Sequence, residues 1–389
     1  MGRSFLVVID GLGIGAQEDA DDYGDEQSDT LGHVSEITGV KLPNFERLGL
    51  GNIKELASIE PSENPGASFG KMREVSAGKD STTGHWELAG VKLEKPFPTY
   101  PNGFPADVIK KFCDLTNTKG ALCNLPYSGT DVIRDYGAEH MKSGNAIVYT
   151  SADSVFQVAC HTDVVPLDLL YEWCERTRNE ICVGEHAVGR VIARPFEGAP
   201  GSFTRISDKR HDYSLEVPAP NLMSELHKAG VGTYSIGKII DLFPGAPFTQ
   251  FRRTKSNAEG ISQLLSLMSA NIDHSFTFVN LIDTDQIYGH RQDTEGYAGA
   301  LEEIDRSLPA ILGKLNSGDL LILTGDHGND PADDRTDHTC EFVPLLACIK
   351  GEKGSNLGIR STFSDAAAAI ADYHNLEIDF NANSFLAND

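Results

Sequence analysis

The pattern of apolar and polar residues divides the chain into strand-like and helix-like segments that alternate. Continuous apolar runs are typical of strands buried on both faces of a parallel sheet, and they predict strands at residues 4–9, 232–240, 274–282 and 320–323. Helices are predicted between and after these strands, at residues 43–48, 222–229, 260–269, 297–314 and 364–373. This alternation predicts an α/β fold, in which helices flank a mostly parallel sheet.

The middle of the chain has a different composition and a different pattern of predicted elements. Prolines lie close together at positions 96, 98, 101 and 105, and a second proline-rich stretch follows at residues 217–220. Between them the pattern predicts short strands at residues 145–149 and 191–193 and a helix at residues 167–178. Because insertions are tolerated at surface loops, we expect an inserted α+β domain at residues 98–219, within a discontinuous core of residues 1–97 and 220–389.

Three of the predicted strands end in residue types that bind metal ions. The carboxyl ends of parallel strands meet at one edge of a sheet, where ligands gather. Carboxylate and imidazole groups at such an edge suit zinc, manganese and similar divalent ions, and six of them suffice for two ions. An aspartate after a strand can also cap a helix, but three such strand ends together favour a metal site. The candidate ligands are Asp10, Asp285, His290, Asp326, His327 and His338.

A cluster of hydroxyl groups precedes Gly84-His85. Ser81, Thr82 and Thr83 follow one another, and hydroxyl groups at a helix start are usually caps. The alternative is a nucleophile that a metal ion activates, which would need no general base. Two ions spaced about 3.5–4 Å apart can clamp the oxygens of an in-line phosphoryl transfer.

The charge of the chain limits its partners. The 389 residues carry 33 basic and 57 acidic side chains, a net charge of −24, which repels nucleic acids and anionic membranes. The apolar runs are too short to cross a bilayer, and the N-terminus has no signal-peptide pattern. Seven cysteines without a C-x-x-C motif indicate free thiols, so we expect a cytoplasmic protein.

Arginines gather in the inserted segment despite the acidic composition. Arg190, Arg194, Arg205 and Arg210 lie within about twenty positions, and His211 follows the last of them. Guanidinium groups bind phosphate through paired hydrogen bonds, although such residues also form ordinary surface ion pairs. Both interpretations stay open on composition alone.

A set of motifs spread over essentially the whole chain resembles the alkaline phosphatase superfamily and, more narrowly, the phosphopentomutase family. The mid-chain motifs differ from those of the related cofactor-independent phosphoglycerate mutases. The matching segments read VVIDGLGIG, GKDSTTGHWE, YTSADSVFQVA, GSFTR, RHDY, SIGKIIDLF, RTKSN, DTDQIYGHR, TGDHGNDP and TDHT.

The resemblance implies roles for individual residues. It assigns Asp326, His327 and Asp10 to one metal ion, and Asp285, His290 and His338 to the other. The phosphorylated residue would be Ser81, where the family usually has threonine, with Thr82 as the alternative register. Cys340 is a second departure, because the family commonly has arginine there. The implied contacts of the sugar phosphate are Ser151, Asp153, Arg190, Arg210, His211 and Lys238.

The implied activity is the interconversion of (deoxy)ribose 1-phosphate and (deoxy)ribose 5-phosphate through a phosphoenzyme. The family implies two divalent ions, manganese above all, and a sugar bisphosphate of the glucose 1,6-bisphosphate type as activator. It implies a small-molecule substrate, no protein partner, and an inserted domain that caps the core and excludes water. The alternatives are a metal-dependent phosphatase or phosphodiesterase, another sugar phosphomutase on the same core, and a metal-stabilised binding protein without catalysis.

Overall fold

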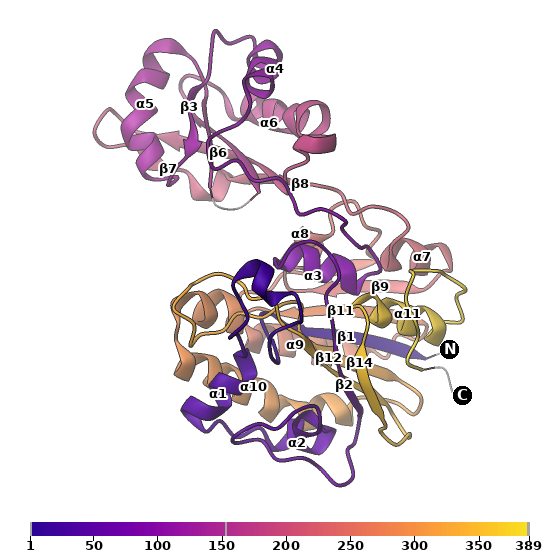
Figure 1. Ribbon diagram of the computed structural model, residues 1–389. Coiled ribbons are helices and arrows are strands. Elements are labelled where there is room, and N and C mark those ends of the chain that lie inside the picture. The colour runs from indigo at the N-terminus through magenta and orange to yellow at the C-terminus, as the bar shows by residue number, and fades with distance from the viewer. Residues whose placement is uncertain (1, 152–153, 387–389) are drawn as a thin grey trace. The chain divides into compact units, whose positions relative to one another are not determined.

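The computed structural model describes residues 2–151 and 154–386 (Figure 1). The chain divides into two compact units. Unit 1 comprises Met1–Lys95 and Glu216–Asp389, and unit 2 comprises Pro96–Leu215. The role of unit 2 as a cap stays a prediction.

An eight-stranded sheet forms the centre of unit 1. The central strand β1 (Arg3–Ile9) pairs in parallel with β11 (Ser275–Leu281) on one side and with β12 (Leu320–Thr324) on the other. The full order is β10-β9-β11-β1-β12-β13-β2-β14. The outer strands are β9 (Gly232–Ile236), β10 (Gln250–Arg252), β2 (Ser68–Met72), β13 (Val343–Ile349) and β14 (Asn356–Arg360). Strand β13 is antiparallel to both of its neighbours, so the sheet is mixed.

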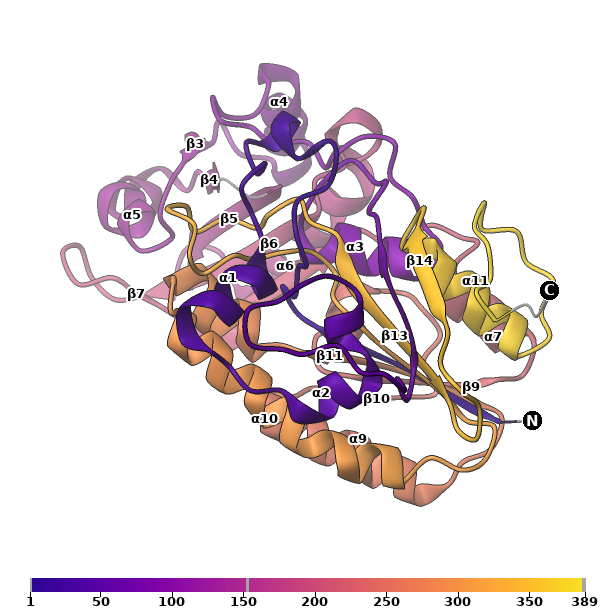
Figure 2. The ribbon, with the colours of Figure 1, turned by 60° about the horizontal axis from the view of Figure 1, so that its bottom comes forward.

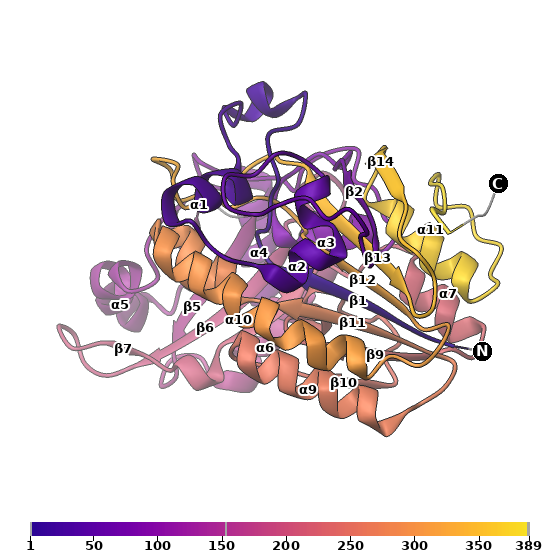
Figure 3. The same cartoon turned by 90° about the horizontal axis from the view of Figure 1, so that it is seen from below.

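Helices cover both faces of this sheet, which confirms the predicted α/β architecture. Helices α1, α2, α9 and α10 lie on one face, and α3, α7, α8 and α11 lie on the other (Figures 1, 2 and 3). Alternate residues of β1 (Phe5, Val7 and Ile9) join the apolar core beneath the first group. The helices span Thr30–Thr38 (α1), Pro43–Leu48 (α2), Ser81–Leu88 (α3), Leu222–Lys228 (α7), Ile239–Leu242 (α8), Asn257–Ala270 (α9), Thr294–Gly313 (α10) and Ser364–Tyr373 (α11).

One strand prediction extends too far. The apolar run at residues 232–240 is a strand only as far as Ile236, because Gly237 adopts a φ of 85° and turns the chain. Lys238 then precedes the short helix α8 instead of lying in a strand. Among the described residues, no helix has both the length and the apolar character that crossing a bilayer requires.

Unit 2 is an α+β structure with its own core. Its sheet has the order β3-β4-β5-β6-β7, and β8 also pairs with β6. The strands are β3 (Leu122–Pro126), β4 (Ile147–Thr150), β5 (Val155–His161), β6 (Arg190–Glu197), β7 (Thr204–Arg205) and β8 (His211–Ser214). The helices are α4 (Ala106–Thr116), α5 (Asp131–Ser143) and α6 (Leu167–Arg176). One apolar cluster forms beside α4 and α6, and a second forms beside α5.

Candidate active site

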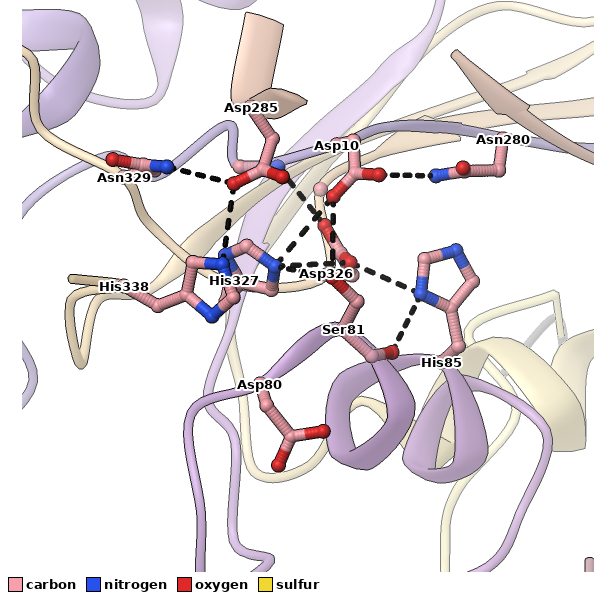
Figure 4. A network of polar contacts seen from close by, with 12 residues as sticks. Asp10, Asp80, Ser81, His85, Asn280, Asp285, Asp326, His327, Asn329 and His338 are labelled. Carbon is pink, nitrogen blue, oxygen red and sulfur yellow. Dashed lines mark hydrogen bonds and ion pairs between the residues drawn. The ribbon is translucent and has the colours of Figure 1, made fainter. Parts of the chain in front are cut away.

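The predicted metal ligands gather at the carboxyl ends of three neighbouring strands. Asp10 directly follows β1, and Asp285 lies in the helical turn Thr284–Tyr288 that follows β11. Asp326 and His327 follow β12. Because β1 lies between β11 and β12 and runs parallel to both, these three ends converge, and the ligand side chains point toward one another (Figure 4).

Two groups of three potential ligands share one histidine. Asp10, Asp326 and His327 form the first group, and Asp285, His327 and His338 form the second, with the ligand atoms of each group within 4.8 Å of one another. The Nε2 atom of His327 lies 3.5 Å from Asp10 Oδ1 and 3.3 Å from Asp326 Oδ2. His327 therefore lies where the two groups meet.

His290 completes the set of six. Its Nε2 atom lies 3.5 Å from Asp285 Oδ1 and 3.2 Å from His338 Nε2. His338 Nε2 lies 3.2 Å from the same Asp285 oxygen. The structure thus brings all six sequence-predicted ligands into one cluster.

The cluster concentrates negative charge in a buried place. Asp10 and Asp326 are completely buried, and Asp285 is nearly so. Burial and the neighbouring Asp326 raise the pKa of Asp10. Burial also acts to raise the pKa of Asp326, but His327 and His85 outweigh it and lower the pKa to about 2. Burial acts in the same way on Asp285, and the hydrogen bond with His338 reverses the effect, so the pKa of Asp285 is lowered.

Further residues, which the sequence pattern did not single out, hold the ligands in place. Asn329 donates from Nδ2 to Asp285 Oδ1 at 2.7 Å, and Asn280 donates from Nδ2 to Asp10 Oδ2 at 3.2 Å. The backbone N–H of Gly11 donates to Asp326 Oδ1 at 3.1 Å. The role of Asn280 could have been predicted, because an asparagine inside the apolar run of β11 would be buried and would need a hydrogen-bond partner.

His85 and Lys238 also contact the carboxylates. His85 Nδ1 lies 3.0 Å from Asp326 Oδ2, and the same nitrogen lies 2.8 Å from the carbonyl oxygen of Ser81. Lys238 Nζ donates to Asp10 Oδ2 at 3.2 Å. Burial acts to lower the pKa of Lys238, but Asp10 and Asp285 outweigh it and raise the pKa.

The hydroxyl groups at the start of α3 point in different directions. Asp80 is the cap of this helix, and its carboxylate accepts from the N–H groups of Thr82 and Thr83. The Thr83 hydroxyl also donates to Asp80, at 2.6 Å. Ser81 Oγ instead lies 3.0 Å from His327 Nε2 and 3.5 Å from Asp10 Oδ1. The capping interpretation therefore applies to Asp80, and Ser81 is free to face the cluster.

Gly84 lets α3 approach the ligand loop closely. A Cβ atom at this position would lie 1.9 Å from the carbonyl oxygen of Asp326, so any side chain would push the helix away. The glycine of the hydroxyl motif therefore sets the distance between Ser81 and the carboxylates.

In unit 2, several predicted substrate contacts line one cavity of about 370 Å³. Ser151, Arg190 and Arg210 are among its lining residues. His211 does not line this cavity. It pairs with Ala193, whose side chain lies on the face of the sheet opposite to the cavity, and it packs there against Tyr171 and Tyr213. Asp153 lies outside the described residues.

Cys340, the second departure from the family pattern, is a buried thiol. Its backbone N–H donates to Asp25 Oδ2, and that aspartate also pairs with Lys79 and Arg335. Burial and the neighbouring Asp19 raise the pKa of Cys340 to about 12, so the thiol stays protonated. Cys340 therefore offers no thiolate nucleophile beside the cluster.

The chain is similar to proteins of known family. The model of the Metalloenzyme superfamily matches residues 2–378. A phosphopentomutase of Caldanaerobacter subterraneus subsp. tengcongensis is 50% identical over 385 residues, which cover 99% of this chain and 97% of that protein. A phosphopentomutase of Acetivibrio thermocellus is 48% identical over 388 residues, which cover 99% of each chain. Among solved structures, the PH0037 protein from Pyrococcus horikoshii matches in fold, with 15% identity and a TM-score of 0.50 over 97% of this chain and 98% of that one.

Proposed function

Because the chain belongs to the Metalloenzyme superfamily and, within it, to the phosphopentomutases, we propose that the cluster at the ends of β1, β11 and β12 is the catalytic centre of a mutase. The reaction is the interconversion of (deoxy)ribose 1-phosphate and (deoxy)ribose 5-phosphate, an intramolecular phosphotransfer. The observation that carries the assignment of this centre is the position of Ser81 Oγ, which lies within 3.5 Å of two of the candidate ligands.

The residues of the cluster fit two divalent cations. Three buried carboxylates within a few ångströms need compensating positive charge, and the three imidazoles beside them are further ligands for such ions. Asp10, Asp326 and His327 would hold one ion, and Asp285, His290 and His338 the other. Bound ions, manganese in our proposal, would neutralise the negative charge that develops on the phosphoryl oxygens.

The chain's own groups carry the phosphoryl group and hold the rest of the substrate. Ser81 Oγ holds the phosphoryl group, and its O–P bond breaks as a new O–P bond forms to the free hydroxyl of the sugar phosphate. The O–P bond between the sugar and its original phosphoryl group then breaks as that group is transferred to Ser81 Oγ, so the enzyme again carries one phosphoryl group. Lys238, Ser151, Arg190 and Arg210 would contact the sugar phosphate, with Asp153 as the further contact that the family implies.

The starting phosphoenzyme needs a phosphoryl donor. We propose that a sugar bisphosphate of the glucose 1,6-bisphosphate type supplies it. We also propose a cytoplasmic location, which the seven unpaired cysteines support.

Phosphorus NMR tests the proposed reaction. The protein is incubated with ribose 5-phosphate, manganese and a trace of glucose 1,6-bisphosphate, and we expect the resonance of ribose 1-phosphate to appear. Release of inorganic phosphate at the rate of turnover would instead identify a phosphatase.

The nucleophile is tested by matched substitutions in the hydroxyl motif. Ser81→Ala should remove both the mutase activity and the phosphoenzyme, because it deletes the oxygen that carries the phosphoryl group. Thr82→Ala and Thr83→Ala should keep some of each, and Ser81→Thr should stay active because it keeps a hydroxyl. Tandem mass spectrometry after treatment with glucose 1,6-bisphosphate locates the phosphate, and its presence on Thr82 would contradict the assignment.

A further inference from the structure

Glu341 is a buried acid of unit 1 that stands three residues after His338. The residue is only 1% exposed, so its side chain is enclosed by the protein. Burying a carboxylate is costly unless polar groups around it compensate for the lost water. The partners of Glu341 therefore indicate what the residue does.

Four hydrogen bonds converge on the two carboxylate oxygens of Glu341. Oε2 accepts from the backbone N–H groups of Gly15 at 3.0 Å and Thr30 at 2.9 Å. Oε1 accepts from the hydroxyl groups of Thr30 at 2.6 Å and Thr339 at 2.7 Å. An ionised carboxylate only accepts, and its oxygens offer about four lone-pair sites, so these donors use its full capacity.

Two of these donors lie on segments that carry proposed metal ligands. Gly15 is in the loop that begins at Asp10, and Thr339 directly follows His338. Thr339 also exchanges two backbone hydrogen bonds with Gly328 in the loop that follows β12, at 3.1 and 2.8 Å. Glu341 thus joins the loop after β1 to the segment of His338 and, through Thr339, to the loop after β12.

Thr30 extends the same network to the ligand that follows β11. While its hydroxyl group donates to Glu341, the hydroxyl oxygen accepts from the backbone N–H of Asn329 at 3.2 Å. The side chain of Asn329 in turn donates to Asp285 Oδ1. A chain of hydrogen bonds therefore runs from Glu341 to Asp285.

Two glycines leave the room that the Glu341 carboxylate fills. A Cβ atom on Gly13 would overlap with this carboxylate, and one on Gly328 would overlap with both the carboxylate and the Thr339 hydroxyl. The carboxylate is therefore packed closely against the backbone of the loops after β1 and β12, which leaves it little freedom to move.

We propose that Glu341 is a positioning residue of the metal centre. Its carboxylate holds the loops after β1 and β12, the start of α1 and the segment of His338 in the arrangement that two cations need. The inference rests on the proposed function, because it presupposes that the cluster binds cations. Glu341 acts on the ligands through other residues, so its loss should weaken the binding of cations without removing a ligand.

Manganese titration of the full chain tests this role. Binding is followed by calorimetry and by the rise in unfolding temperature that the ion causes. Burial raises the pKa of Glu341 to about 7, although the hydrogen bonds from Thr30 and Thr339 act to lower it. Measurements at pH 8 therefore keep the carboxylate largely ionised. Glu341→Gln replaces one acceptor oxygen by a donor group and should weaken manganese binding about tenfold.

The matched control is a second buried carboxylate, that of Asp305 on α10. It accepts from the backbone N–H groups of Asn44 and Phe45, both at 2.9 Å, and so holds the start of α2. Asp305→Asn should lower the unfolding temperature of the metal-free protein. Its manganese affinity, and the rise in unfolding temperature that manganese causes, should match those of the wild type.

Three further variants keep the charge of Glu341 and separate its position from its charge. Gly13→Ala displaces the carboxylate, and Thr339→Val removes one of its donors. Each should weaken manganese binding about 2- to 10-fold, the range expected for one hydrogen bond. Thr339→Ser keeps the hydroxyl group and should retain the wild-type affinity.

The outcomes distinguish this inference from the proposed function. Wild-type manganese affinity in Glu341→Gln would overturn the positioning role. A loss in Glu341→Gln that is absent from both Gly13→Ala and Thr339→Val would also overturn it, because only the charge would then matter. Mutase activity of the wild type would stand in both cases. A wild-type protein that binds no manganese would instead overturn the proposed metal centre, and this inference with it.

Discussion

The cluster of unit 1 and the cavity of unit 2 are opposite in charge and in construction. The cluster gathers three buried carboxylates at the ends of parallel strands, and neighbouring asparagine, histidine and backbone groups hold them. The cavity gathers four arginines of unit 2 in its lining, namely Arg190, Arg194, Arg205 and Arg210. In a chain with a net charge of −24, the carboxylate cluster and the arginine-lined cavity thus lie in different compact units. The cluster is suited to cations, and the cavity is suited to an anion.

The largest effect is expected when a carboxylate or an imidazole is removed from the cluster, because this tests directly whether the cluster binds cations. Asp326→Ala and His338→Ala should each lower mutase activity about a hundredfold or more, because each removes a proposed metal ligand. The fold should survive, since the ligands follow the strands instead of forming them. Steady-state kinetics, elemental analysis and circular dichroism check the three parts of this prediction.

The control for these variants is Asp334→Ala, an exposed aspartate of the same loop. It should behave as the wild type. More than about a tenth of the wild-type turnover in either cluster variant, roughly 1.4 kcal/mol of barrier, would contradict the assignment of that residue.

A smaller effect is expected from the residues that hold the ligands. Asn329→Ala removes the hydrogen bond to Asp285 Oδ1 and should weaken manganese binding about 10- to 100-fold, because such partners orient a ligand without touching the ion. Titration with manganese, followed calorimetrically, measures the change. Asn64→Ala, at an exposed position, is the control. Equal manganese affinity in both variants would show that the Asp285 carboxylate needs no such support.

The smallest effect concerns stability, and it compares a buried histidine in each unit. Burial lowers the pKa of His374 in unit 1 from its ordinary value of 6.5 to about 4, and Ser4 Oγ lies 2.7 Å from its Nε2. Burial also lowers the pKa of His140 in unit 2. As the pH falls, these imidazoles are therefore protonated in the unfolded chain before they are protonated in the folded chain. Their stabilising contribution is present above pH 6.5 and is lost as the pH falls below it, which for His374 continues toward pH 4.

Urea unfolding at pH 7 and pH 5 measures this loss. His374 alone should account for about 2 kcal/mol of the difference in the free energy of unfolding. His374→Gln should reduce the pH dependence, and His140→Gln should reduce it at the transition of unit 2 if the units unfold separately. An unchanged dependence in the His374 variant would contradict the prediction.

Much of the cluster could be predicted because its ligands directly follow long apolar runs. Asp10 and Asp326 stand where a buried strand ends, which a linear pattern reveals. The supporting contacts could not be read in the same way. Asn329 acts on Asp285, which is 44 residues away in the chain.

Among the outer strands, β2, β10, β13 and β14 were not predicted. Strands β2 and β14 have mixed burial, and β14 carries exposed residues along most of its length, so neither forms a continuous apolar run. The first five residues of β13 are buried and do form such a run, but the antiparallel direction of the strand depends on partners far away in the chain. In unit 2, Arg194 was predicted only as part of an arginine-rich segment, and Arg190 was also a contact that the family resemblance implied. Their period of two along β6 could have placed them on one face.

The position of β1 in the middle of the sheet has a consequence for protein synthesis. Its seven residues are all buried, but they pair with Ser275–Leu281 and Leu320–Thr324, which the ribosome adds more than 260 residues later. The first strand to be made must therefore wait, with unpaired backbone groups and apolar side chains, until most of the chain exists. His338, the last of the proposed ligands, follows both partner strands. A nascent chain thus completes its metal site only after the centre of its sheet can form, so metal capture marks a late step in folding.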